Sequence, residues 1–261
     1  MNILDRIVAD KKIEVALKSS QVSIAYLEAA ALFERSCVSM ATAIKESPSG
    51  IIAEHKRRSP SKDVINNGLK LPEVVRGYTQ AGVCGISVLT DGPYFGGALE
   101  DLLLARASVN TPLLRKDFTV SEYQILEAKA HGADVILLIA AVLSREEIKQ
   151  FSELTQSLGM EVLLEVHDRA ELEKSLMPSL NMVGVNNRNL KTFEVSLDTS
   201  KSLVGTIPSD FVKISESGLS QAAAVKELQS YGYEGFLVGE NFMKTNDPGG
   251  AAAQFIKQIE A

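Results

Sequence analysis

The chain has 261 residues, of which 45% are hydrophobic and 23% charged, and its formal net charge at pH 7 is −6. This composition allows a large buried core and excludes a disordered, collagen-like or disulfide-stapled chain. The excess of acidic groups leaves no basic surface for nucleic acid, so an anionic ligand would have to be bound in a local pocket.

We expect no segment of the chain to enter a membrane. The longest uninterrupted apolar run covers residues 135–143, whereas a transmembrane helix needs about 20 residues. Asp5 and Asp10 stand where a signal peptide would have its basic and apolar segments. The sequence therefore predicts a cytoplasmic protein.

Short apolar runs of strand length alternate with segments of helical periodicity. The expected strands are residues 51–56, 86–90, 113–116, 135–140, 162–166, 183–186, 211–215 and 236–239. The expected helices are residues 72–81, 99–107, 121–131, 144–158, 168–176, 196–204, 220–231 and 248–259. Eight such units predict an α/β fold, a single (β/α)8 TIM barrel over residues 47–261. An open doubly wound sheet is the alternative, but its nucleotide-binding form carries G-x-G-x-x-G after the first strand, which is absent here.

Residues 1–46 precede the first strand. Apolar residues recur there at helical spacing, for example at Ile3, Ile7 and Leu17, with charged residues between them. We expect one or two extra helices that form an N-terminal helical extension of the same structural domain. The spacing leaves open whether they cover the bottom of the barrel or help to close its top.

Charged and polar side chains occur where expected strands end. Strand alternation places Glu54 and Lys56 on one face of the first strand, and Lys116, Glu165 and Asn186 end the third, fifth and sixth. They could be solvated rim residues. However, this end of a barrel carries the chemistry, and burying one charge unpaired would cost several kcal/mol. We therefore expect mutual pairing in a pocket, with Lys and Glu as general acid and base.

Glycines follow the seventh and eighth expected strands, where barrels commonly bind phosphate with backbone amides and a short helix. Gly218 and Gly239 therefore predict a phosphate site, although each could simply make a tight turn. We expect the carboxylate of Glu240 to point away from a bound phosphate while its amide contributes. Arg188 adds positive charge and favours an acidic substrate.

The remaining candidates are weaker. The three histidines are scattered, and no spacing of His, Cys, Asp and Glu matches a zinc or iron site, so we expect no protein-bound metal. His167 could reach the pocket rim, but a hydrogen-bonded structural histidine is the simpler interpretation. Phe95, Phe118 and Phe193 could line a slot for a planar ring or pack in the core.

Six motifs occur in one order along the chain. They are I-A-E-H-K-R-R-S-P-S (52–61), S-V-L-T-D (87–91), L-R-K-D-F (114–118), L-E-V-H (164–167), G-V-N-N-R-N-L (184–190) and S-E-S-G (215–218). In this order, and over essentially the whole chain, they resemble the indole-3-glycerol phosphate synthase family. The resemblance implies a lyase of tryptophan biosynthesis that converts 1-(o-carboxyphenylamino)-1-deoxyribulose 5-phosphate into indole-3-glycerol phosphate, carbon dioxide and water. It implies no cofactor or metal, and we expect a monomer.

The resemblance also implies roles for single residues. Lys116 would be the general acid on the ribulose carbonyl, and Lys56 would lie near the carboxylate or the phosphate. A second ammonium group nearby would make Lys116 a better proton donor. Glu165 and Glu54 would support these charges and take the proton during dehydration, and Asn186 would orient a hydroxyl. The implied substrate-binding residues are Ser59, Ser217, Gly218, Gly239 and Glu240 for phosphate or substrate, Arg188 for the carboxylate, and Phe95, Phe118, Leu137 and Leu190 for the ring.

Two other functions suit a phosphate-binding barrel. One is a phosphoribosylanthranilate isomerase or a related sugar-phosphate isomerase, which would centre on an Asp and Cys acid–base pair, whereas Lys56 and Lys116 favour a decarboxylation. The other is a non-catalytic barrel that binds a phosphorylated metabolite, and the presence of both Lys116 and Glu165 argues against it.

Overall fold

The computed structural model describes residues 3–189 and 192–261. Eight parallel strands form a closed barrel in which each strand pairs with the next and β8 pairs with β1. The strands are β1 (Ile51–His55), β2 (Gly85–Leu89), β3 (Leu113–Lys116), β4 (Val135–Ile139), β5 (Glu161–Val166), β6 (Met182–Asn186), β7 (Val212–Glu216) and β8 (Gly235–Val238). The predicted (β/α)8 barrel is confirmed.

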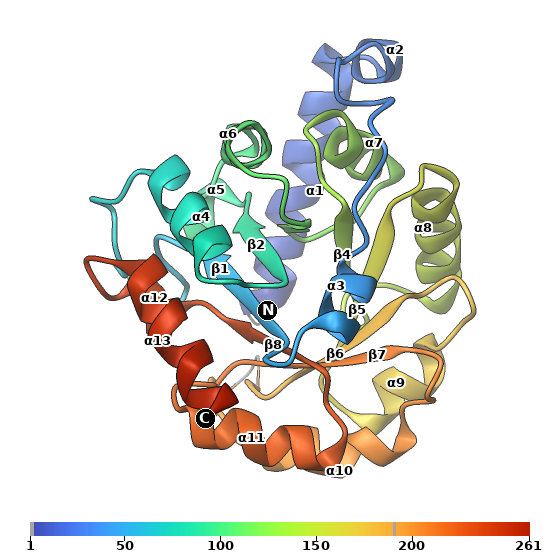
Figure 1. The fold of residues 1–261 in the computed structure, drawn as a ribbon. Coiled ribbons are helices and arrows are strands. Elements are labelled where there is room, and N and C mark those ends of the chain that lie inside the picture. The colour runs from blue at the N-terminus through green and yellow to red at the C-terminus, as the bar shows by residue number, and fades with distance from the viewer. Residues whose placement is uncertain (1–2, 190–191) are drawn as a thin grey trace.

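Helices surround the barrel on its outside (Figure 1). Those that alternate with the strands are α4 (Leu71–Gln80), α6 (Leu99–Ser108), α7 (Glu122–Ala130), α8 (Arg145–Ser157), α9 (Arg169–Ser175), α10 (Asp198–Leu203), α11 (Ala222–Tyr231) and α13 (Pro248–Glu260). The connections also contain α5 (Gly92–Phe95), the 3-10 turn η1 (Val204–Thr206) and α12 (Glu240–Met243). The strands and outer helices begin and end within two residues of the predicted positions.

Side-chain caps fix where several helices begin. The Ser144 hydroxyl accepts a hydrogen bond from the Glu147 amide at 3.1 Å, and the Glu147 carboxylate accepts one from the Ser144 amide at 2.8 Å. This reciprocal pair satisfies two amides that the first turn of α8 leaves free. Asp168 caps α9 in a similar way by accepting from the Glu171 amide. The loops that follow β4 and β5 therefore end where α8 and α9 are capped.

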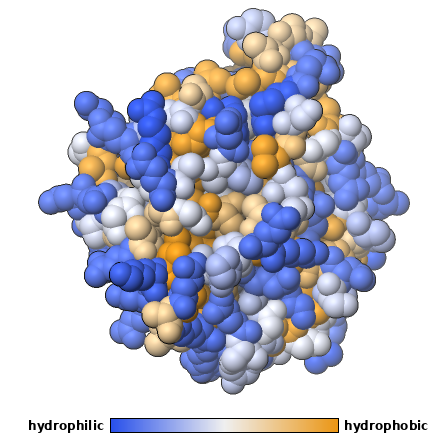
Figure 2. Space-filling model, viewed as in Figure 1, coloured by the Kyte–Doolittle hydropathy of each residue, from blue (hydrophilic) through white to orange (hydrophobic). Residues whose placement is uncertain are grey.

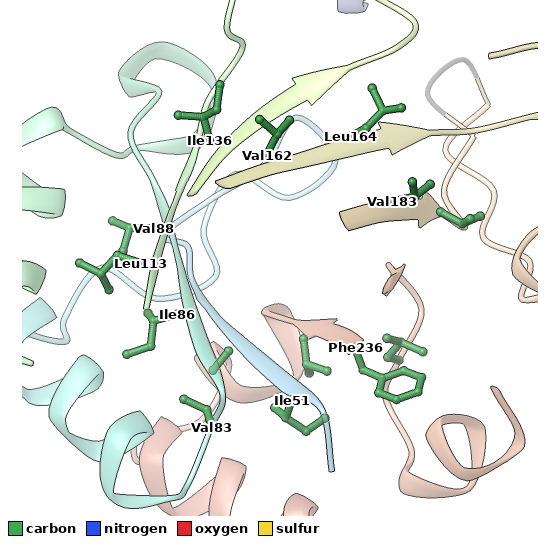
Figure 3. Packing of buried hydrophobic residues seen from close by; sticks show 14 of the residues in the cluster. Ile51, Val83, Ile86, Val88, Leu113, Ile136, Val162, Leu164, Val183 and Phe236 are labelled. Carbon is green, nitrogen blue, oxygen red and sulfur yellow. The ribbon is translucent and has the colours of Figure 1, made fainter. Parts of the chain in front are cut away.

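Alternate residues of each strand face opposite sides of the barrel wall. Ile136, Leu164 and Phe236 lie on the outer side and belong to the cluster that packs against the helices (Figure 3). Leu163 and Ile214 face inward and belong to a separate cluster that fills the barrel interior. Burial of each such side chain stabilises the fold by about 1.5–3 kcal/mol.

The N-terminal extension contains three helices, not the expected one or two: α1 (Ile3–Gln21), α2 (Ile24–Glu28) and α3 (Met40–Glu46). Figure 1 shows α2 beside α7, outside the barrel. Met40 and Ile44 of α3 are buried in the inner cluster, and a Cβ added at Gly85, the first residue of β2, would lie 2.6 Å from Met40. Ile3 and Ile7 of α1 line a pocket at the opposite end. The extension therefore covers the bottom and helps to close the top.

The face seen in Figure 2 has hydrophilic residues over most of its outer rim, with apolar residues closer to the middle. Among residues 3–189 and 192–261, none of the helices has the length and apolar character that a bilayer span requires.

Candidate active site

A pocket with a volume of 390 Å³ opens at the C-terminal ends of the strands. The predicted site residues that line it are Glu54, Lys56, Ser59, Phe95, Lys116, Phe118, Leu137, Glu165, Asn186, Arg188, Ser217, Gly218, Gly239 and Glu240. Leu190, the remaining predicted residue, lies outside the described residues. The fold therefore brings together residues that are up to 186 positions apart in the sequence.

Lys116 lies at the centre of a buried charge cluster. Its ammonium group is 2.7 Å from a carboxylate oxygen of Glu165 and 2.7 Å from one of Glu216. Burial disfavours the charged amine, but the carboxylates of Glu165, Glu216 and Glu54 outweigh burial and raise the pKa of Lys116 above its usual range. Lys116 is therefore protonated at neutral pH. Its charged neighbours are carboxylates, so the expectation that a second ammonium group tunes it is wrong for this structure.

Glu165 accepts hydrogen bonds at both oxygens. Lys116 donates to Oε2 at 2.7 Å, and the amide of Asn186 donates to Oε1 at 3.1 Å. Burial opposes ionisation, but Lys116 and the neighbouring His167 outweigh it and lower the pKa of Glu165 to about 2. Glu165 is therefore a carboxylate at neutral pH, which is the state that a general base requires.

Glu216 is a further member of the cluster that the sequence does not single out. Its Oε2 accepts from Lys116, and its buried Oε1 has no hydrogen-bond partner among the described residues. Burial and the nearby Glu165 raise the pKa of Glu216 to about 7, although Lys116 opposes this rise. A Cβ added at Gly184 would lie 2.2 Å from Oε1, so the glycine on β6 makes room for this carboxylate. The alternation of side chains on β7 could have identified it, because Glu216 lies on the same inward face as Val212 and Ile214.

Glu54 and Lys56 form a second pair at the end of β1, where the Lys56 ammonium is 2.6 Å from the Glu54 carboxylate. Glu54 is buried, whereas 19% of the Lys56 side chain is exposed, so the lysine faces the open part of the pocket. The expected pairing of two lysines with two glutamates is therefore present in the structure, although β1 ends at His55 and Lys56 begins the following loop.

We expect Lys56→Ala to raise KM about tenfold or more and also to lower kcat, because its ammonium group can contact a substrate anion in the ground state. Steady-state kinetics on the variant would test this. Lys45→Ala, a change at an exposed lysine near the end of α3, is the matched control. A change confined to kcat would contradict the binding role and make Lys56 a second proton donor.

The loops after β7 and β8 contain the residues that are predicted to bind phosphate. Ser217 and Gly218 both have positive φ, 68° and 79°, and Gly239 precedes α12. The Glu240 carboxylate lies 2.8 Å from the Lys62 ammonium, and this contact with Lys62 lowers the pKa of Glu240. A Cβ added at Gly239 would lie 2.5 Å from the Glu54 carboxylate. A side chain at Gly239 would therefore force Glu54 to move, whether or not the glycine approaches a phosphate.

One wall of the pocket is apolar. The rings of Phe95 and Phe118 lie 6.0 Å apart at 41°, and Leu137, which belongs to the inner cluster, also lines the pocket. Phe193 also lines the pocket, and its carbonyl accepts a hydrogen bond from the Arg188 guanidinium at 3.3 Å. These aromatic rings therefore border the pocket. Within the described chain no group of three His, Cys, Asp or Glu residues is placed to hold a metal ion.

Comparison with solved structures identifies the fold. The chain superposes on 3-hexulose-6-phosphate synthase from Salmonella typhimurium with a TM-score of 0.63 and 13% identity, over 81% of this chain and 98% of that one. It superposes on a tryptophan synthase complex from Pyrococcus furiosus with a TM-score of 0.59 and 15% identity, over 81% and 97%. At such identities the similarity establishes the barrel and nothing about the reaction.

Comparison of sequences is more specific. The family model of indole-3-glycerol phosphate synthase matches residues 4–257. The chain is 44% identical to the indole-3-glycerol phosphate synthase of Bacteroides thetaiotaomicron over 99% of both chains. It is 44% identical to that of a Polaromonas species over 97% of both. The chain belongs to the indole-3-glycerol phosphate synthase family.

Proposed function

We propose that the chain is an indole-3-glycerol phosphate synthase, a carboxy-lyase that closes the indole ring of its substrate with loss of carbon dioxide and water. The observation that carries this proposal is the Lys116 ammonium group held between Glu165 and Glu216 at the catalytic end of the barrel. A barrel that only bound a metabolite would not need these buried, like-charged carboxylates around one lysine. That the enzyme acts as a monomer in the cytoplasm stays a prediction.

Ring closure forms a bond between the ring carbon that carries the carboxylate and the ribulose carbonyl carbon. Lys116 holds the proton that the carbonyl oxygen takes up as this bond forms. Loss of carbon dioxide then restores the aromatic ring. The hydroxyl then leaves as water with a proton from Lys116, once the lysine has been protonated again. Glu165, ionised and fixed by Asn186, takes the proton that is lost from the carbon beside the nitrogen. Glu216, with a pKa of about 7, is suited to exchanging a proton with Lys116 between these steps.

The three parts of the substrate match three parts of the pocket. The planar ring fits between the apolar residues Phe95, Phe118 and Leu137. The phosphate fits the amides of the loops after β7 and β8. Lys56 and Arg188 supply positive charge for the anionic groups. This division keeps the carboxyl-bearing carbon near Lys116.

Incubation of the purified protein with 1-(o-carboxyphenylamino)-1-deoxyribulose 5-phosphate tests the proposal. We expect indole fluorescence to appear together with one equivalent of carbon dioxide. Neither an isomerase nor a metabolite-binding barrel would produce this signal. Absence of indole product from folded protein would overturn the proposed activity.

We expect inorganic phosphate to inhibit competitively at millimolar concentrations, because the substrate phosphate would occupy the same amides. Glu240→Gln should lower the inhibition constant for phosphate about threefold, since it removes the negative charge of the first residue of α12 and frees Lys62. Inhibition by phosphate that is not competitive, or that is unchanged by Glu240→Gln, would place the phosphate elsewhere. Gly239→Leu cannot decide this point, because its side chain would also displace Glu54.

A further inference from the structure

His167 lies directly after β5, between the charge cluster and the outside of the barrel. Its Nε2 is 3.4 Å from Oε1 of Glu165, and its Nδ1 is 3.2 Å from Oε2 of Glu171 on α9. The same Glu171 oxygen accepts from the His167 backbone amide at 2.8 Å. Nε2 is buried and has no hydrogen-bond partner among the described residues. The imidazole therefore lies between two carboxylates, hydrogen-bonded to Glu171 and 3.4 Å from Glu165, and a small rotation of the ring would let Nε2 donate to Glu165.

These groups form a series of proton carriers that runs from the surface to the charge cluster. Glu171 is the outermost, with 19% of its side chain exposed, whereas Glu165 has 5% exposed. Glu165 in turn contacts Lys116 at 2.7 Å, and Lys116 contacts Glu216. His167 is not among the described residues that line the pocket. The series therefore reaches the base from behind, and a bound substrate would not interrupt it.

The reaction needs such a route because it consumes a proton. The substrate enters with an ionised carboxylate, loses that group as neutral carbon dioxide, and loses a hydroxyl group as water. The electron pair of the broken carbon–carboxyl bond restores the ring, so the hydroxyl can leave as water only if one proton per turnover comes from solvent. A substrate that fills the pocket covers the direct path from solvent to Lys116.

We propose that Glu171 and His167 form a proton inlet from solvent to the buried cluster of Glu165, Lys116 and Glu216. Starting from the neutral ring with its proton on Nε2, Nδ1 takes a proton from Glu171, Nε2 then gives its proton to Glu165, and Glu171 takes a new proton from water. The ring is left with its proton on Nδ1 and returns to the Nε2–H form by proton exchange before the next turnover. Lys116, which gave its proton to the ribulose oxygen, regains one through Glu165. The inference rests on the proposed function, since only that reaction sets this proton demand.

The charges around His167 suit the inlet. Glu171 on α9 and Glu165 on β5 lie within 3.4 Å of the imidazole, and the negative charge of Glu216 on β7 also acts on it. Burial disfavours the charged ring, but these carboxylates outweigh burial and raise the pKa of His167. A histidine with a raised pKa holds a proton on both nitrogens more readily near neutrality, and this is the state in which Nε2 can donate.

The test compares His167→Gln and His167→Ala with the unmodified enzyme. In weakly buffered solution, stopped-flow indole fluorescence reports product and a pH indicator reports proton uptake. We expect kcat to fall about tenfold in both variants with KM within about twofold, and the solvent deuterium isotope effect on kcat to increase. Added imidazole should restore kcat of His167→Ala in proportion to its concentration, because it can carry protons through the space left by the side chain.

Two further variants make the result decisive. His131→Gln changes a histidine whose Nδ1 contacts only the Glu127 backbone carbonyl among the described residues, and should leave kcat and proton uptake unchanged. Glu171→Gln keeps His167 in place and should lower kcat as His167→Gln does. An unchanged kcat in His167→Gln, a change in KM alone, or no rescue by imidazole would overturn the inlet. If the unmodified enzyme makes no indole product, the proposed function itself has failed.

Discussion

Lys116→Ala is expected to lower kcat by at least about 10³-fold while KM stays within about tenfold. The ammonium group acts mainly as the carbonyl oxygen gains negative charge, so its loss affects the transition state more than the bound substrate. General acid catalysis contributes about 10²–10⁴-fold by itself. The fall in kcat should exceed the lower end of this range. The variant also leaves the neighbouring carboxylates of Glu165 and Glu216 without their shared cation.

Two control variants distinguish the role of Lys116 as a proton donor from its role as a positive charge between two carboxylates. Lys116→Arg keeps a cation between the carboxylates but releases its proton much less readily, so it should remain folded and nearly inactive. Lys149→Ala, at a lysine whose side chain is 67% exposed on α8, should behave like the unmodified enzyme. Single-turnover indole fluorescence would measure all three variants. Substantial turnover by folded Lys116→Ala would contradict the role of general acid.

The sequence predicts the barrel well because the fold depends on short-range periodicity. Strand runs and helical segments alternate eight times, and the same alternation that separates inner from outer apolar residues also directs Glu54, Lys116 and Glu165 inward. Positions at the C-terminal ends of the strands then meet because the barrel closes. No pairing between distant strands has to be known for this inference.

The features that sequence could not provide depend on contacts across the barrel. Glu216 lies within a motif that suggests a phosphate loop, and only the closed barrel shows it 2.7 Å from Lys116. Gly239 has the position of a phosphate-binding glycine. However, any side chain at this position would also collide with the Glu54 carboxylate, and only the closed barrel shows this contact. The extension is a second example, because helical spacing in residues 1–46 does not show that Ile7 lines the pocket while Ile44 packs in the inner cluster at the opposite end.

Glu216→Gln should gain stability relative to the unmodified enzyme as the pH rises from 5 to 8, and should be much less active. In the folded protein, burial and the nearby Glu165 raise the pKa of Glu216 from its ordinary value of about 4.5 to about 7. A group with a raised folded-state pKa contributes stability that is fully present below pH 4.5 and is lost as the pH rises through 7. A glutamine does not titrate and avoids this loss. The variant should therefore gain about 2–3 kcal/mol relative to the unmodified enzyme between pH 5 and pH 8, with kcat about 10²-fold lower.

Urea unfolding at pH 5, 6.5 and 8 measures this difference. Glu165 has a lowered pKa of about 2, so its contribution stays constant over this range and is lost only as the pH falls below 4.5. His167 titrates in both proteins, so its contribution largely cancels in the comparison. Glu153→Gln, at an exposed position of α8, should show no pH-dependent gain. A stability difference between Glu216→Gln and the unmodified enzyme that stays constant from pH 5 to pH 8 would show that Glu216 is ionised throughout. Lys116 would then have to recover its proton without Glu216.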